Sequence, residues 1–119
     1  MTSDAIRYHT GLAAEEAAER IYAAQGASTL ARRARTQSGE IDLIVELAGE
    51  VIFVEVKARR TAATAAASLS QRQQARIFAA AELWLAETGR SPLTPCRFDV
   101  VTVDATGRAE VIENAFGAA

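Results

Sequence analysis

The stretch from residue 39 to residue 57 constrains the fold more than any other part of the chain. Apolar and polar residues alternate there with period two on both sides of Ala48-Gly49, a pattern typical of two strands joined by a tight turn. If these two residues form the loop, Leu47 faces Glu50, and the numbers of every cross-strand pair add up to 97. The pattern therefore predicts an antiparallel hairpin, and a loop of even length is needed to keep this register.

This register predicts one charged and one apolar face of the hairpin. Asp42 lies opposite Glu55 and Glu40 lies opposite Lys57, all on the charged face. Like charges opposed on neighbouring strands are destabilising, and local faults of this kind tend to mark functional sites. Mg²⁺ would relieve the repulsion, because it binds one or two carboxylates and keeps several waters. The predicted core face carries Ile41, Leu43, Val45, Leu47, Ile52, Val54 and Val56.

Lys57 is the only lysine of the chain, whereas arginine occurs twelve times. A lysine ammonium is a compact point charge whose pKa responds readily to its surroundings, unlike an arginine guanidinium. On the charged face it points to the same place as Glu55. This choice of residue is a hint that an ammonium is needed beside a phosphate or a water.

Length and composition predict a single domain that spans residues 1–119 and holds one hydrophobic core. No apolar run approaches the ~18 residues that a membrane-spanning helix requires, and the first residues lack the layout of a signal peptide. The single cysteine, Cys96, excludes an internal disulfide and a cysteine-based metal cage. We expect Cys96 to be a buried or half-buried residue at the start of a strand, and the protein to be cytoplasmic, with no membrane partner.

The distribution of charge is more informative than the net charge of −2. No acidic residue occurs between Glu55 and Glu82, and this interval contains Lys57, Arg59, Arg60, Arg72 and Arg76. A second basic cluster consists of Arg32, Arg33 and Arg35. Such stretches can follow a phosphate backbone, but they are also common on ordinary solvated surfaces.

The remaining elements follow from periodicity and from residues that begin or end helices. The predicted elements are a helix over 11–25, a strand over 28–35, a loop over 58–68, a helix from the N-cap Ser70 to about Glu87, and strands over 97–103 and 109–112. Trp84 falls in the core stripe of the second helix. By pattern alone, Glu15 is a solvated carboxylate at the border of the first helix's buried face. The order predicts an α/β fold, with a mixed sheet and a helix on each side.

Asp42, followed after twelve residues by Glu55-Val56-Lys57, resembles the PD-(D/E)xK nuclease motif. The chain as a whole is similar to a small, uncharacterised bacterial family with a restriction-endonuclease-like fold, related in plan to Holliday junction resolvases. The residues that carry the resemblance are Gly11-x-x-x-Glu15-x-x-Ala18, Gly39 to Ile44, Phe53 to Arg59, Arg97 to Val101 and Asn114-Ala115-Phe116.

The resemblance implies a site for Mg²⁺ or Mn²⁺ and a set of nucleic-acid contacts. The implied metal ligands are the carboxylates of Glu15, Asp42 and Glu55, together with the Val56 carbonyl, and the implied catalytic residues are Asp42, Glu55 and Lys57. The implied nucleic-acid contacts are Arg59, Arg60, Arg72, Gln73 and Arg76. Two positions depart from the family's usual pattern: Ala14 stands where a glycine is usual, and Gln73 stands where a lysine is usual.

These observations leave three functional hypotheses open. The first is a metal-dependent DNA endonuclease that acts on branched or damaged DNA in repair or recombination. The second is a non-catalytic nucleic-acid-binding or repair accessory protein that retains the nuclease fold. The third is a protein-interaction module in which Glu40 and Lys57 form a plain cross-strand ion pair. Cleavage of a four-way junction requires two active sites and hence a symmetric homodimer, although no stripe in the sequence identifies an interface.

Overall fold

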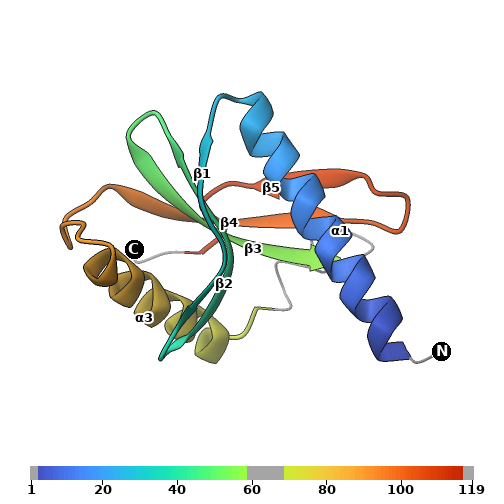
Figure 1. The fold of residues 1–119 in the computed structure, drawn as a ribbon, viewed down its shortest axis with the longest axis horizontal. Helices are drawn as coiled ribbons and strands as arrows, with labels where there is room; N and C mark the ends of the chain where they lie inside the picture. The colour runs from blue at the N-terminus through green and yellow to red at the C-terminus, as the bar shows by residue number, and fades with distance from the viewer. Residues whose placement is uncertain (1–2, 59–68, 117–119) are drawn as a thin grey trace.

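The computed structural model describes the backbone of residues 3–58 and 69–116, and it describes side chains in these ranges from residue 12 onward (Figure 1). The elements within these ranges are α1 (Ser3–Ala24), β1 (Ser28–Thr36), β2 (Gly39–Leu47), β3 (Glu50–Ala58), α3 (Gln71–Glu87), β4 (Cys96–Val103) and β5 (Ala109–Ile112). The strands form one mixed sheet in the order β1-β2-β3-β4-β5. Only the β3–β4 neighbours in it are parallel, and α3 lies in the crossover between them, as parallel pairing requires.

The two helices cover opposite faces of this sheet (Figure 1). Successive side chains of a strand point to opposite faces. On β3, Ile52 and Val54 therefore pack with α1, whereas Val51 and Phe53 pack with α3. The predicted mixed sheet with a helix on each side is confirmed. On the face predicted to carry the four charged residues, the half next to the turn is apolar and packs against α3.

The predicted register of the β2–β3 hairpin is confirmed. Cross-strand partners run from Leu47 opposite Glu50 to Leu43 opposite Val54. Ala48 and Gly49 both have left-handed backbones, with φ of 52° and 81°. Two central residues with positive φ are the signature of a type I′ turn, whose twist matches that of the flanking strands.

Helix α3 matches its prediction at both ends. Ser70 caps it: the Ser70 hydroxyl accepts from the backbone N–H of Gln73, and the Gln73 side chain accepts from the backbone N–H of Ser70. Trp84 is buried as predicted, with its ring edge-on to Phe53 at a centroid distance of 5.9 Å. The capping box fixes where α3 begins, and the aromatic contact holds its C-terminal half against the sheet.

Two other sequence predictions need correction. Helix α1 begins at Ser3 rather than at residue 11, because a glycine inside a helix costs only about 1 kcal/mol and Gly11 does not end it. Cys96 is the first residue of β4, as predicted, but it is exposed rather than buried. The predicted 58–68 loop lies outside the described residues except for Ala58, which ends β3. No helix in the described part of the chain is long and apolar enough to cross a membrane.

A fully buried carboxylate, Asp99, ties α1 to the far half of the sheet. It accepts hydrogen bonds from the Tyr22 hydroxyl at 2.7 Å, from the Asn114 backbone N–H at 2.9 Å and from Arg97 Nε at 3.0 Å. Burial, and then the neighbouring Asp99, raise the pKa of the Tyr22 phenol. Because both carboxylate oxygens of Asp99 have donors, this centre is a satisfied polar network that positions α1.

Candidate functional site

The site begins at an irregularity that β1 and β2 share. Arg32 pairs with Leu43, and Ala34 pairs with Ile41, while Arg33 between them has a left-handed backbone with φ of 47°. Alternation reverses at this point: Leu43 faces α1, but Ile41 joins the cluster on the α3 face. The prediction that Ile41 and Leu43 share a face is therefore wrong.

The same irregularity turns Asp42 toward α1. Its side chain lines a pocket together with Leu43, Arg32 and Arg33. The β2–β3 ladder has its last pair at Leu43 and Val54, one residue short of Asp42. Instead, Asp42 Oδ2 accepts a hydrogen bond of 2.8 Å from the Val56 backbone N–H. The side chain thus replaces a main-chain acceptor at the point where the two strands separate.

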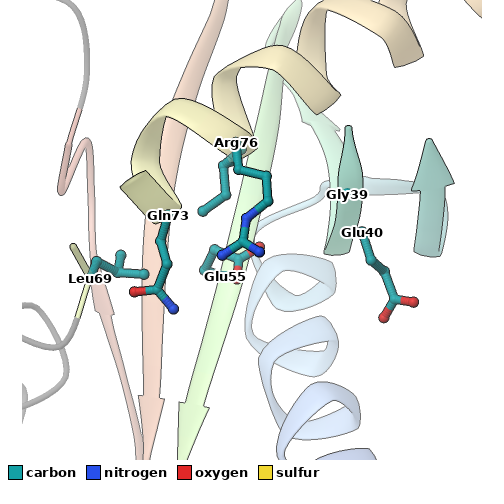
Figure 2. Close-up of a pocket in the computed structure, with 7 residues that line it drawn as sticks. Gly39, Glu40, Glu55, Leu69, Gln73 and Arg76 are labelled. Atoms are coloured by element: carbon teal, nitrogen blue, oxygen red, sulfur yellow. The ribbon is translucent and has the colours of Figure 1, made fainter. Parts of the chain in front are cut away.

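Glu55 points into a different pocket, on the side of α3. Gly39 and Leu69 line this pocket with it, as do Gln73 and Arg76 of α3 (Figure 2). Glu55 Oε1 is buried and has no hydrogen-bond partner among the described residues. Asp42 and Glu55 therefore line different pockets, but they remain neighbours at the strand ends, because the charge and the backbone of Asp42 both act on the Glu55 carboxyl group.

Burial and mutual repulsion raise the pKa values of both carboxyl groups. Burial is the main cause at Asp42, with the charge of Glu15 adding to it, and the pKa rises to about 6. At Glu55, burial and then the Asp42 charge raise the pKa to about 8. The Lys57 charge opposes both shifts, so the ammonium lies within electrostatic reach of each carboxylate. The raised pKa values mean that the fold stabilises two ionised carboxylates here poorly without a further cation, and the Glu55 oxygen without a partner among the described residues is available to one.

Glu15 lies in the pocket of Asp42 and already has a cationic partner. Arg33 Nε donates to Glu15 Oε1 at 2.6 Å, and the Glu15 side chain is 20% exposed. Glu15 is therefore neither the solvated carboxylate that its helical position suggests nor part of an assembled metal site. Among the described residues, no group of three or more acidic, histidine or cysteine side chains is arranged to hold a metal ion. Of the four implied ligands, Glu15 and Asp42 line one pocket, Glu55 lies within electrostatic reach of Asp42, and the Val56 N–H donates to Asp42.

Arg76 is a predicted nucleic-acid contact that lines the same pocket as Glu55. It is exposed, and Figure 2 shows its side chain extending from α3 into the pocket that Glu55 lines. Arg76 lies over Gly39, where an added Cβ would stand 3.2 Å from Arg76 Cγ. Gly39 also has φ of 147°, a conformation that other residues rarely adopt. Gly39 therefore leaves room for Arg76 at the pocket, a role that its place in a polar loop does not reveal.

The other predicted nucleic-acid contacts lie away from the Glu55 pocket, are engaged in another interaction or fall outside the described residues. Arg72 is exposed but does not line the Glu55 pocket, and the Gln73 side-chain oxygen is engaged in capping α3. Arg59 and Arg60 lie outside the described residues. Glu40 pairs with Arg35 of β1 at 3.2 Å rather than with Lys57, so the cross-strand ion pair of the interaction-module hypothesis is not formed.

Residues 14–103 match the model of a family described as "Uncharacterised protein family UPF0102". The chain belongs to this family. A UPF0102 protein of Cereibacter sphaeroides strain KD131 is 54% identical over 116 residues, which cover 98% of this chain and 99% of that protein. A UPF0102 protein of Ruegeria pomeroyi is 50% identical over 118 residues, with 98% and 96% covered. A third, from Saccharophagus degradans, is 44% identical over 109 residues, with 90% and 92% covered. The names of these three proteins give the family and no function.

Proposed function

We propose that this UPF0102 protein is a metal-dependent DNA endonuclease with a restriction-endonuclease-like fold. The observation that carries the proposal is the pair of neighbouring, largely buried acids at the end of the hairpin where β2 and β3 separate. Asp42 and Glu55 are largely buried with raised pKa values, and one Glu55 oxygen has no partner among the described residues. Proteins keep such groups where a site requires them, since a buried, unpaired polar atom costs about 1–3 kcal/mol.

The residues fit Mg²⁺ or Mn²⁺, because carboxylate oxygens are the ligands that these hard cations prefer. Asp42 and Glu55 would hold the cation, with Glu15 available from the same pocket as Asp42. When bound, the metal would lower the pKa of a coordinated water and offset charge that develops on the scissile phosphate. Lys57 would orient the attacking water and stabilise the added negative charge, since its ammonium is within electrostatic reach of both acids.

The exposed arginines of α3 support DNA as the substrate. Arg72 and Arg76 lie on the first turns of α3, where guanidinium groups can contact backbone phosphates without reading bases. Replacing either arginine by alanine is expected to weaken DNA binding and to flatten its dependence on salt concentration. The matched control is Arg108→Ala, which removes an exposed arginine from the turn between β4 and β5. Equal weakening in all three variants would argue against a binding face on α3.

The decisive experiment is a cleavage panel with linear, nicked, flapped and four-way DNA in Mg²⁺ or Mn²⁺. Glu55→Gln and Lys57→Ala are each expected to lower the cleavage rate by about 10² or more, with circular dichroism unchanged. Glu46→Gln is the control, because Glu46 is an exposed carboxylate at the turn end of the same hairpin. If Glu55→Gln or Lys57→Ala cleaves as fast as the parent protein, the assignment is wrong.

A non-catalytic nucleic-acid-binding or repair accessory role is the second candidate. It is favoured by the Arg33–Glu15 contact at 2.6 Å, which already neutralises one of the implied metal ligands. Calorimetry with Mn²⁺ separates the candidates: salt-dependent DNA binding without metal binding at millimolar concentration identifies the accessory protein. A preference for four-way DNA, together with a dimer in sedimentation, would support the resolvase-like homodimer. Action in cytoplasmic repair or recombination remains a prediction.

A further inference from the structure

Two neighbouring ion pairs join α1 to β1, and they differ in their surroundings. Arg32 contacts Glu19 through Nε at 2.8 Å and Nη2 at 2.6 Å, and the Thr29 hydroxyl also donates to Glu19 at 2.8 Å. One helical turn away, the Glu15 carboxylate accepts from Arg33 Nε at 2.6 Å. Glu15 adds its charge to that of Asp42 in a shared pocket. The Arg33–Glu15 pair therefore adjoins the candidate metal site.

An unusual backbone conformation brings Arg33 to this position. Consecutive strand residues normally point to opposite faces, yet Arg32 and Arg33 both contact carboxylates of α1. The left-handed φ of 47° at Arg33 makes this possible. Such a conformation is costly for an arginine, and costly conformations in folded proteins concentrate at functional sites and switch regions. The same irregularity turns Asp42 into the pocket. One distortion therefore places both the Arg33 guanidinium and the Asp42 carboxylate.

We propose that Arg33 is an internal counter-ion that holds Glu15 until a divalent cation binds beside Asp42, and then releases Glu15 as a further ligand. The ion pair is partly buried, with 33% of the Arg33 and 20% of the Glu15 side chain accessible, so it breaks more easily than a fully buried pair would. A divalent cation attracts the carboxylates of Glu15 and Asp42 more strongly than one delocalised guanidinium charge does. This inference rests on the metal site of the proposed function and adds the regulation of that site.

The test is calorimetric titration of the metal-free protein with Mn²⁺. Arg33→Asn is the informative variant, since asparagine removes the charge and tolerates a left-handed backbone. It is expected to bind Mn²⁺ five- to tenfold more tightly than the parent, because binding no longer breaks an ion pair. Arg32→Asn, the matched control, and Arg33→Lys, which keeps a cation, are expected to stay within about twofold of the parent.

A double variant and a stability measurement identify Glu15 as the released ligand. In Arg33→Asn, adding Glu15→Gln is expected to remove the gain in affinity. In thermal unfolding, Arg33→Asn is expected to melt at a lower temperature than the parent in EDTA, and to gain more from Mn²⁺. The proposal is overturned if Arg33→Asn binds no more tightly than a parent that does bind Mn²⁺, or if the gain survives Glu15→Gln. If neither parent nor variants bind Mn²⁺, the metal site of the proposed function fails as well.

Discussion

Asp99 is a buried acid and Glu55 a half-buried acid of the same sheet, and they differ in how their oxygens are satisfied. Asp99 is fully buried, and both of its oxygens accept hydrogen bonds from Tyr22, Arg97 or Asn114. Glu55 keeps a buried oxygen with no partner among the described residues, and burial raises its pKa. A complete set of donors stabilises a fold, whereas an incomplete one destabilises it unless a ligand completes the set. The contrast gives Asp99 a structural role and supports Glu55 as part of the proposed site.

The largest expected effect on stability is at Asp99, whose two oxygens both have hydrogen-bond donors. Asp99→Asn is expected to lower the free energy of unfolding by about 3–5 kcal/mol, because an amide cannot serve all three donors and leaves Arg97 without its buried partner. Urea denaturation at pH 7 measures this loss. Glu110→Gln, an exposed substitution on β5, is the control and should change stability by less than about 0.5 kcal/mol. A loss below 1 kcal/mol for Asp99→Asn would remove the contrast between the centres.

The matching substitution at Glu55 is expected to raise the free energy of unfolding, whereas Asp99→Asn lowers it. In EDTA at pH 8, Glu55→Gln should raise the free energy of unfolding by about 2 kcal/mol, because it removes a buried charge. The folded pKa is raised to about 8 from an ordinary value of 4.5. Below the ordinary value both states are protonated, and as pH rises from 4.5 to 8 the unfolded chain ionises first, so the parent loses stability.

The gap between Glu55→Gln and the parent should therefore shrink as pH falls from 8 to 5. Urea denaturation at both pH values measures it, and Glu46→Gln, an exposed substitution on the same hairpin, is the control. A Glu55→Gln variant less stable than the parent at pH 8 would mean that Glu55 has a structural partner. Adding Mn²⁺ should stabilise the parent and leave the variant unchanged, which links the stability measurement to the proposed metal site.

Tyr22→Phe tests a single contact of the satisfied centre. It removes the hydroxyl that donates to Asp99 at 2.7 Å and keeps the ring in the core. The free energy of unfolding should fall by about 1–2 kcal/mol, the cost of a lost charged hydrogen bond. The rate of DNA cleavage should be unchanged, because Asp99 and Tyr22 do not line either pocket of the candidate site. A large loss of cleavage with little loss of stability would show that the two centres are coupled.

The smallest effect is expected at an exposed ion pair next to the site. Arg35 is 87% exposed and pairs with Glu40 at 3.2 Å. Arg35→Ala should change the free energy of unfolding by less than about 0.5 kcal/mol, because solvent screens exposed pairs. Thermal unfolding at low and high salt measures this. A loss above 1 kcal/mol would show that ion pairs of β1 hold the hairpin in place, and would weaken the distinction between buried and exposed acids.

The sequence by itself determined the hairpin register and the limits of α3. An Ala-Gly loop, period-two alternation and a Ser70 cap act over a few residues, so local chemistry specifies them. The sequence also singled out Asp42, Glu55 and Lys57, because charged residues on a well-patterned hairpin stand out. The endonuclease activity and the Mg²⁺ or Mn²⁺ cofactor stay predictions.

Only the tertiary structure decided which way these acids point and which groups they meet. The left-handed residue at Arg33 reverses the alternation, turns Asp42 toward α1 and pairs Arg33 with Glu15. No local pattern predicts this, since the conformation of Arg33 depends on how β1 packs against α1 and pairs with β2. The donors around Asp99 likewise come from α1, β4 and the segment after β5. The burial and the hydrogen bonds of these acids depend on contacts between distant segments. Burial and hydrogen bonding in turn set the charge of each acid.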